Sequence, residues 1–185
     1  MKYEYTLIRS KRRTLSLQIK GGELIVRAPN RVSKREIDDF VLRHEAWIDK
    51  QRSKIAGRES ELSAVPKLTE EELNKLAEQA RVYIPSRVEY YAARIGLSYG
   101  RITLRCQKTR WGSCSAKKNL NFNILLMLTP PEVIDSVVVH ELCHLKEMNH
   151  SDRFYKLVYA ACPDYDRWNK WLKQNGAAIM ARVDR

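Results

Sequence analysis

Residues 133–150 read VIDSVVVHELCHLKEMNH, and this stretch is the most informative part of the chain. On a helix, residues four apart lie on one face, so His140 and His144 can present their imidazoles to the same point, with Glu141 on the adjacent side. Three of the four histidines of the chain fall in this segment. The valines that precede the motif give such a helix an apolar face to bury. The pattern therefore predicts a buried helix that carries two histidines at one point.

His150 is the natural third nitrogen ligand. An unbroken helix would place it roughly 240° around the axis from His144, so we expect the helix to end between the two. Asn149 tolerates the left-handed conformation that ends helices and is the expected stop. Zinc in hydrolytic sites takes three protein ligands and leaves the fourth position to water. The spacing predicts a zinc site with these ligands and base: His140, His144 and His150, with Glu141 as general base.

Two other interpretations of these residues stay open. The histidines could fall at this spacing by chance on a basic surface helix, or the zinc could be structural and have a fourth protein ligand. A closed structural site would leave Glu141 without a role. His44 belongs to the packing face of an earlier predicted helix, with a role as fourth ligand as its alternative.

The N-terminal third predicts a small antiparallel sheet followed by a helix. Three short segments there alternate apolar and polar side chains, and Gly21-Gly22 fits a hairpin turn. The segments are residues 3–8, 14–20 and 23–27. A capping box at Ser33 predicts one helix through Ile48, and the charged stretch 50–67 predicts a helix end and a linker. This N-terminal lobe is placed at residues 1–60.

The rest of the chain predicts a mainly helical domain with a short sheet beside the histidine helix. A capping box at Thr69 opens a helix that passes Pro85 with a kink and ends at Gly96. Short strands are expected next, and two further helices follow the histidine helix, which is placed at residues 131–148. The strands are residues 102–106, 119–123 and 125–128. The fold class is α+β, and this second domain is placed at residues 67–185.

Several further segments carry a resemblance to a known family. They are RWGSCS at residues 110–115, NFN at 121–123, the two prolines at 130–131, and VVHELCH at 138–144. These residues closely resemble the YgjP-like metallopeptidase-domain family, over nearly the whole chain. The resemblance implies a zincin-like, zinc-dependent hydrolase with a gluzincin-like or SprT-like active-site helix. It implies the same zinc ligands and the same base as the spacing does, and some members are described as UTP pyrophosphatases.

The charge of the chain indicates anionic partners. Its 185 residues carry a formal net charge of +12, which favours nucleic acid, nucleotide phosphate or acidic polypeptide, although a solvated basic surface is the plain alternative. A basic segment leads through Arg110 and Trp111 to Asn121 and Asn123, which are candidate substrate-binding residues. Core packing for Trp111 and Phe122, and turn or strand-end positions for the two asparagines, stay open.

The sequence also bears on location. No window approaches the ~18 apolar residues of a membrane span, and the start of the chain lacks the apolar segment of a secretory signal. The four cysteines form no Cys-x-x-Cys pair, which suits a reducing compartment. We therefore expect a cytoplasmic protein with no membrane partner.

Three classes of function follow. The favoured class is a zinc metallopeptidase that acts on a peptide or protein, held extended along an edge strand near residues 119–123. The second is a nucleoside triphosphate (UTP) pyrophosphatase, although the chain has no Gly-rich phosphate loop and no paired carboxylate motif. The third is a basic nucleic-acid-binding module whose zinc is structural.

Overall fold

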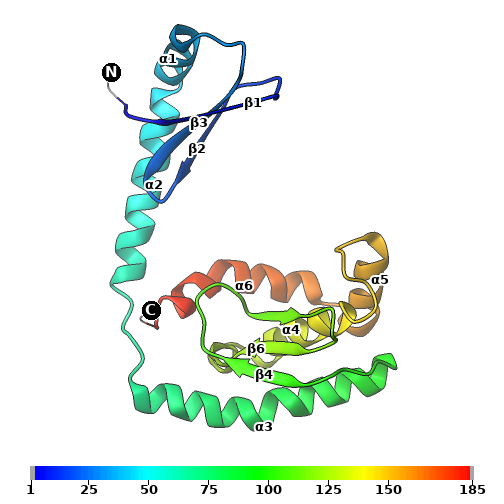
Figure 1. The fold of residues 1–185 in the computed structure, drawn as a ribbon. Helices are drawn as coiled ribbons and strands as arrows, with labels where there is room; N and C mark the ends of the chain where they lie inside the picture. The colour runs from blue at the N-terminus through cyan, green and yellow to red at the C-terminus, as the bar shows by residue number, and fades with distance from the viewer. Residues whose placement is uncertain (1–2, 184–185) are drawn as a thin grey trace. The chain divides into compact units, whose positions relative to one another are not determined.

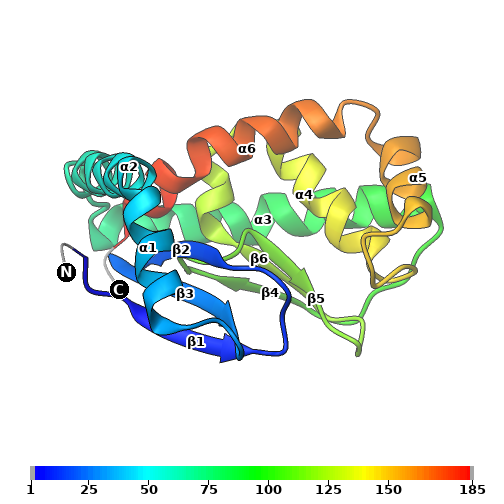
Figure 2. The same cartoon turned by 90° about the horizontal axis from the view of Figure 1, so that it is seen from above.

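The computed structural model describes residues 3–183, and the chain divides into two compact units, Met1–Ala64 and Val65–Arg185. Each unit has its own three-stranded sheet and its own helices (Figures 1 and 2). The predicted α+β fold class is confirmed. Each unit is described by itself below.

The sheet of the first unit consists of β1 (Thr6–Ser10), β2 (Ser16–Lys20) and β3 (Glu23–Pro29), in the order β1-β3-β2. β2 and β3 form the predicted antiparallel hairpin, whereas β1 pairs with β3 in parallel. The prediction of a purely antiparallel sheet was therefore wrong. Burial explains why β3 is the central strand. It buries Leu24, Val26 and Ala28, and in the central position this most apolar strand is covered by a neighbouring strand along each edge.

Two helices, α1 (Lys34–Arg43) and α2 (Glu45–Ser63), cover this sheet. The capping box at Ser33 is confirmed, but the predicted single helix breaks at His44. His44 is exposed, and its Nδ1 lies 2.8 Å from the Phe40 carbonyl oxygen, so it is not on the packing face. α2 runs on through most of the predicted linker because this stretch is rich in good helix formers.

The second unit begins with α3 (Glu70–Ile95), which opens on the predicted capping box and ends at Gly96 in the left-handed conformation. Its sheet has the order β4-β6-β5, with β4 (Ile102–Arg105), β5 (Gly112–Cys114) and β6 (Leu120–Asn123). β6 is central, parallel to β4 and antiparallel to β5.

The predicted strand at residues 125–128 is wrong, because this segment is the 3₁₀ helix η1 (Ile124–Leu128). The Asn123 side-chain oxygen accepts a hydrogen bond from the Leu125 backbone N–H at 3.1 Å, which turns the chain at the end of β6. Conversely, β5 was not among the predicted strands. Three residues are too few to show the alternation of apolar and polar side chains by which strands are recognised.

Three helices complete the second unit: α4 (Pro131–Cys143), α5 (Asp152–Ala161) and α6 (Tyr165–Met180). α4 packs against α3, α5, α6 and β5 and so lies at the centre of the unit, as the views of Figures 1 and 2 also show. Arg87 on α3 forms a two-pronged ion pair with Asp135 on α4, at 2.7 and 2.8 Å. The central helix is thus fixed by both apolar packing and charge.

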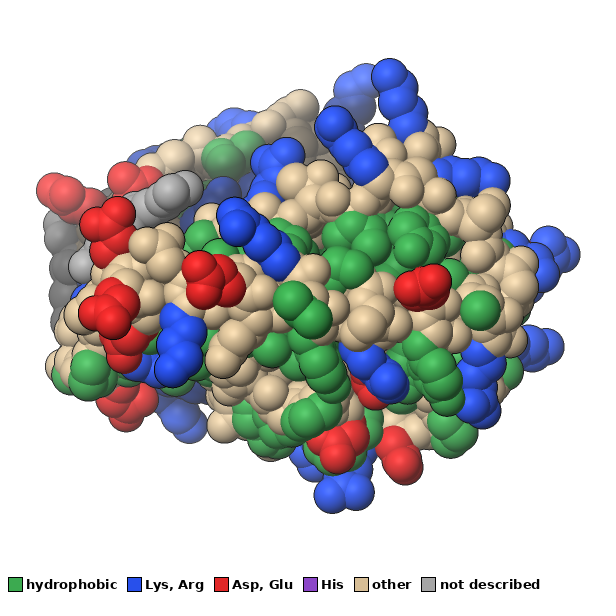
Figure 3. All heavy atoms as spheres, turned by 90° about the horizontal axis from the view of Figure 1, so that it is seen from below, with side chains coloured by type: hydrophobic (Ala, Val, Ile, Leu, Met, Phe, Trp, Pro, Cys, Tyr) green, Lys and Arg blue, Asp and Glu red, His purple; other side chains and the backbone are tan. Residues whose placement is uncertain are grey.

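Within residues 3–183, no helix is long and apolar enough to cross a membrane. On the face seen from below in Figure 3, basic, acidic and hydrophobic side chains are interspersed. The net positive charge is therefore not gathered into one patch on that face.

Candidate metal centre

The histidines are positioned by the end of α4 and the turn that follows. α4 ends at Cys143, before the predicted Met148, and backbone N–H groups of the next residues bond back over short turns, as from Leu145 to the Leu142 carbonyl at 3.0 Å. Among the described residues other than glycine only Lys118 has a positive φ, so the expected left-handed stop at Asn149 was wrong. The helix does end before His150, with His144 as its C-terminal cap residue, as the geometry of a helix required.

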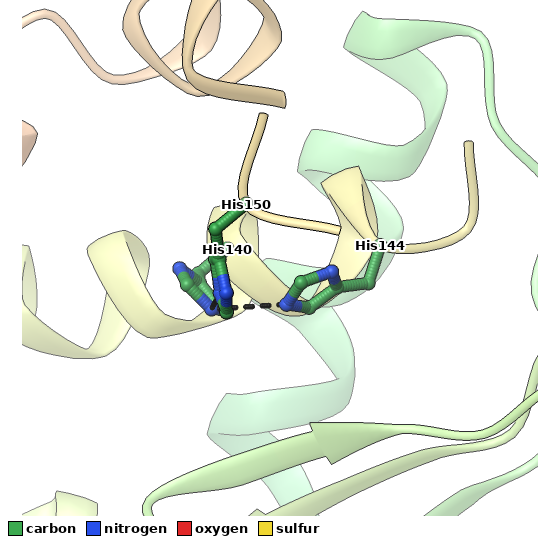
Figure 4. A group of neighbouring side chains, drawn as sticks. All are labelled: His140, His144 and His150. Carbon is green, nitrogen blue, oxygen red and sulfur yellow. Dashed lines mark hydrogen bonds between the residues drawn. The ribbon is translucent and has the colours of Figure 1, made fainter. Parts of the chain in front are cut away.

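The three histidines converge through their Nε2 atoms (Figure 4). The Nε2 of His140 lies 3.1 Å from that of His144 and 3.1 Å from that of His150. His140 lies in α4 and His144 is the C-terminal cap residue of that helix, whereas His150 comes from the turn just before Ser151, whose side chain caps α5. In the part of the chain that the structure describes, these three form the one cluster of potential metal ligands.

The outer nitrogens of two rings are held by hydrogen bonds. His140 Nδ1 lies 2.8 Å from the hydroxyl oxygen of Tyr165, and His144 Nδ1 donates to the backbone carbonyl of Glu147 at 3.1 Å. A ring whose Nδ1–H is engaged in this way leaves the Nε2 lone pair free. The neighbours thus orient the rings toward the shared point.

The protonation states of His140 and His144 also favour metal binding. Burial, reinforced by the two neighbouring histidines, lowers the pKa of His140 to about 4, and burial also lowers the pKa of His144. Both rings are therefore neutral near pH 7. Tetrahedral zinc with Zn–N bonds of about 2.0–2.1 Å separates its nitrogens by about 3.3 Å. The observed spacing and the neutral donors fit such an ion.

Glu141 lies on the adjacent side of α4 and is only 6% exposed. A Cβ atom on Gly112 of β5 would come within 2.7 Å of its Cγ and Oε1 atoms, so the carboxyl lies directly against the backbone of that strand. Among the described residues the carboxyl has no hydrogen-bond partner, and burial raises the pKa of Glu141 to about 8. A buried carboxyl in this state is a candidate for proton transfer.

A cavity of about 210 Å³ opens beside His140 and Glu141. Trp111 and Arg110, two of the four predicted substrate-binding residues, line it together with residues of α4 and α6. Trp111 also packs on the core, so the two interpretations of this residue both apply. The complete lining is Arg110, Trp111, Gly112, Ser136, Val137, His140, Glu141, Tyr165, Asn169 and Leu172.

The other two predicted substrate-binding residues do not line this cavity. Asn121 donates to the Ser113 hydroxyl at 3.1 Å across the β5–β6 pair. Asn123 is fully buried, and its amide donates to the carbonyls of Gln107 and Arg110 at 2.6 and 2.9 Å. It therefore fixes the loop that precedes Trp111, and Phe122 beside it is a core residue.

Tyr165 and Gly112 belong to the site but were not among the predicted site residues. Tyr165 is 25 residues from His140, and Gly112 meets Glu141 only through the packing of β5 on α4. Neither residue has a local sequence signal that would mark it as part of the site, since both contacts depend on tertiary packing.

The fold and this cluster define a class: an α+β protein with three histidines that could hold a metal ion, beside a buried glutamate. Within that class, the chain belongs to the YgjP-like family, metallopeptidase domain, which matches residues 13–75 and 64–175. The resemblance seen in the sequence is thereby confirmed.

Two solved structures are similar to about half of this chain. The zymogen of the metallopeptidase abylysin from Pyrococcus abyssi has 18% identity and a TM-score of 0.45, over 49% of this chain and 93% of that one. The zymogen of jannalysin from Methanocaldococcus jannaschii has 21% identity and a TM-score of 0.45, over 50% and 95%. At these scores neither bears on the function of this chain. No curated protein matches it.

Proposed function

We propose that this chain is a zinc-dependent metallopeptidase in which His140, His144 and His150 hold the ion and Glu141 is the general base. The observation that carries the proposal is the convergence of three histidine nitrogens beside a buried carboxyl, at the wall of a cavity. Membership of a metallopeptidase family supports a peptide or protein as the substrate.

A purely structural zinc is less well supported by the same residues. A closed site needs a fourth protein ligand. The residues that the structure describes supply three histidines to the cluster, and Cys143 is buried on α4 without joining it. A cavity at the cluster and a carboxyl next to it are what a hydrolytic site requires.

The chemistry divides between the ion and the protein. A zinc ion supplies Lewis-acid chemistry, since it acidifies a water molecule to a pKa near 7 and polarises a carbonyl group. Glu141 accepts the proton of the attacking water on its carboxylate and returns it to the leaving amine. Tyr165 holds the ring of His140 in place through Nδ1. Trp111, Val137 and Leu172 give part of the cavity wall an apolar surface beside this proton transfer.

The substrate backbone has a natural place along β5. The peptide was predicted to lie beside residues 119–123. However, β6 is hydrogen-bonded to β4 on one side and to β5 on the other, so it offers no free edge. β5 pairs only with β6 among the described residues, and its Gly112 lies against Glu141. An extended peptide added to the free edge of β5 would bring its carbonyl groups past the carboxyl.

The test compares the purified wild type with Glu141→Gln on two substrates, an unfolded protein and UTP, after elemental analysis of both proteins for zinc. Gln keeps the shape of the side chain but cannot accept the proton, so we expect full zinc content and loss of proteolysis by about 100-fold or more. Glu89→Gln, an exposed position on α3, is the matched control and should behave as wild type.

The two substrates separate the outcomes. Proteolysis that depends on Glu141 supports the proposal. Release of pyrophosphate that depends on Glu141, with the protein substrate left intact, would replace the peptidase by a nucleotide hydrolase. Undiminished proteolysis by Glu141→Gln would refute the assigned base.

A further inference from the structure

Two segments of the first unit are basic and contain no acidic residue. They are residues 9–13, RSKRR, and residues 27–35, RAPNRVSKR. The basic residues of the two segments are Arg9, Lys11, Arg12, Arg13, Arg27, Arg31, Lys34 and Arg35. The metal centre lies in the other unit and makes no use of these residues.

The strand order brings the two segments together. β1 and β3 are parallel neighbours with Ser10 opposite Pro29, so both segments leave the sheet at the same end. The connection from β1 to β2, residues 11–15, then crosses the end of β3, because β2 lies on the far side of that strand. If β2 lay between β1 and β3 instead, the two segments would be about 10 Å apart.

The segments enclose a depression of about 360 Å³, here called the basic depression. Arg9 holds its wall in place, because its Nη1 donates to the carbonyls of Pro29, Asn30 and Val32 at 3.1, 3.1 and 2.7 Å. The residues that line the basic depression are Ser10, Lys11, Arg12, Arg13, Pro29, Asn30 and Arg31.

Within residues 3–183, the cations of the basic depression lack anionic partners. Lys11, Arg13 and Arg31 are exposed, and no carboxylate among residues 3–183 pairs with them. Arg12 donates through Nη1 to the Ser16 hydroxyl at 2.9 Å, but its Nε is buried and has no acceptor in the described part of the chain. A buried guanidinium N–H without an acceptor is unfavourable, and an anion in the depression would satisfy it.

We propose that the basic depression binds backbone phosphates of nucleic acid. Arg guanidinium groups and a Lys ammonium match phosphate oxygens in charge and hydrogen bonding. A duplex carries one negative charge per ~1.7 Å of its axis, so it can engage several of these cations at once. The net charge of +12 adds long-range attraction. This inference is independent of the proposed peptidase chemistry.

A membrane surface fits the basic depression less well. Binding to a bilayer interface uses Trp, Phe or Leu side chains beside the cations. The large hydrophobic residues that are exposed in the first unit, Leu42 and Trp47, lie on α1 and α2 and do not line the depression. Ser10 and Asn30, which do line it, are polar.

The experiment measures binding of a fluorescein-labelled 20-base-pair DNA duplex by fluorescence anisotropy, from low to moderate salt. The variant K11Q/R13Q/R31Q removes three exposed cations of the depression. We expect it to bind about tenfold or more weakly and to reduce the slope of log K against log salt by about 3. The matched control, K50Q/K54Q/R58Q on exposed positions of α2, removes the same charge and should change affinity less than about threefold.

Circular dichroism checks that both variants are folded, and their zinc content and hydrolytic activity should equal those of wild type. Failure of the wild type to bind the duplex would overturn the proposal. So would equal weakening by the two triple variants, which would reduce the effect to net charge. A third contrary result is that the binding of phosphatidylserine vesicles or of polyglutamate depends on Lys11, Arg13 and Arg31, whereas the binding of the duplex does not.

Discussion

Gly112→Ala tests whether the contact between β5 and α4 sets the position of Glu141, the proposed general base. The new Cβ would lie 2.7 Å from the Cγ and Oε1 atoms of Glu141, against an ordinary contact distance of 3.4 Å, so one of the two must move by about 0.7 Å. Glu141 is 6% exposed and borders the cavity, so its carboxyl would be displaced toward the cavity and away from its present position. A displacement of this order at a catalytic group can cost about 100-fold in rate.

We therefore expect kcat/KM for an unfolded protein substrate to fall by about 30- to 100-fold, which corresponds to about 2–3 kcal/mol of transition-state stabilisation. Overpacking should lower the free energy of unfolding by about 1–3 kcal/mol. Zinc content should be unchanged, because the three atoms nearest to the new Cβ all belong to Glu141 and not to a histidine. The assays are cleavage of a quenched fluorescent protein, elemental analysis and denaturant unfolding.

Gly57→Ala is the matched control, since a Cβ at Gly57 on α2 would meet nothing within 4 Å. Ala is the better helix former, so this variant should keep full activity and gain about 0.5–1 kcal/mol in stability. Full activity of Gly112→Ala with normal zinc content would refute the idea that this contact positions the base.

Three further predictions concern the unit that contains the metal centre, Val65–Arg185. Tyr165→Phe removes the hydrogen bond to His140 Nδ1 while it keeps the ring, so zinc affinity should fall about 10- to 100-fold in competition with a chelator. His150→Ala should abolish stable zinc binding by elemental analysis, whereas His44→Ala, outside the cluster, should retain it. Burial raises the pKa of Cys143 to about 12, so its thiol stays protonated through pH 9, and mass spectrometry should find it alkylated by iodoacetamide only after unfolding.

The spacing of His140 and His144 could be read from the sequence because a helix fixes which residues share a face. The same geometry required the helix to end before His150, and it does. The conformation in which this helix ends could not be predicted from the sequence. The sequence offered Asn149 as the stop, but the chain instead turns over the residues directly after Cys143, where Lys146 and Glu147 both bond to the Cys143 carbonyl.

Strand order was harder to predict than strand position. Alternation located β1, β2 and β3 closely, but alternation says nothing about which strand is central. That choice depends on how much each strand buries, and β3 buries the most. The same limit applies in the second unit, where β6 was expected at an edge and is central.

Contacts between distant segments left no trace in the sequence. Asn123 was a candidate for binding substrate, but its buried amide holds the loop that carries Arg110. The missing side chain of Gly112 makes room for Glu141, which lies 29 positions further along. Each of these roles exists only once the sheet has packed on α4.

The brevity of β5 has a consequence for selectivity. A free edge of three residues, Gly112–Cys114, can bond only to a partner whose own backbone groups are unoccupied. In a native protein nearly all buried backbone groups are already paired, whereas an unfolded stretch offers them freely. Such an edge would select unfolded substrates over folded ones, independently of any recognition of their side chains. The edge is also too short to pair firmly with another copy of the chain, so under the proposed function this edge of β5 would stay available to substrate.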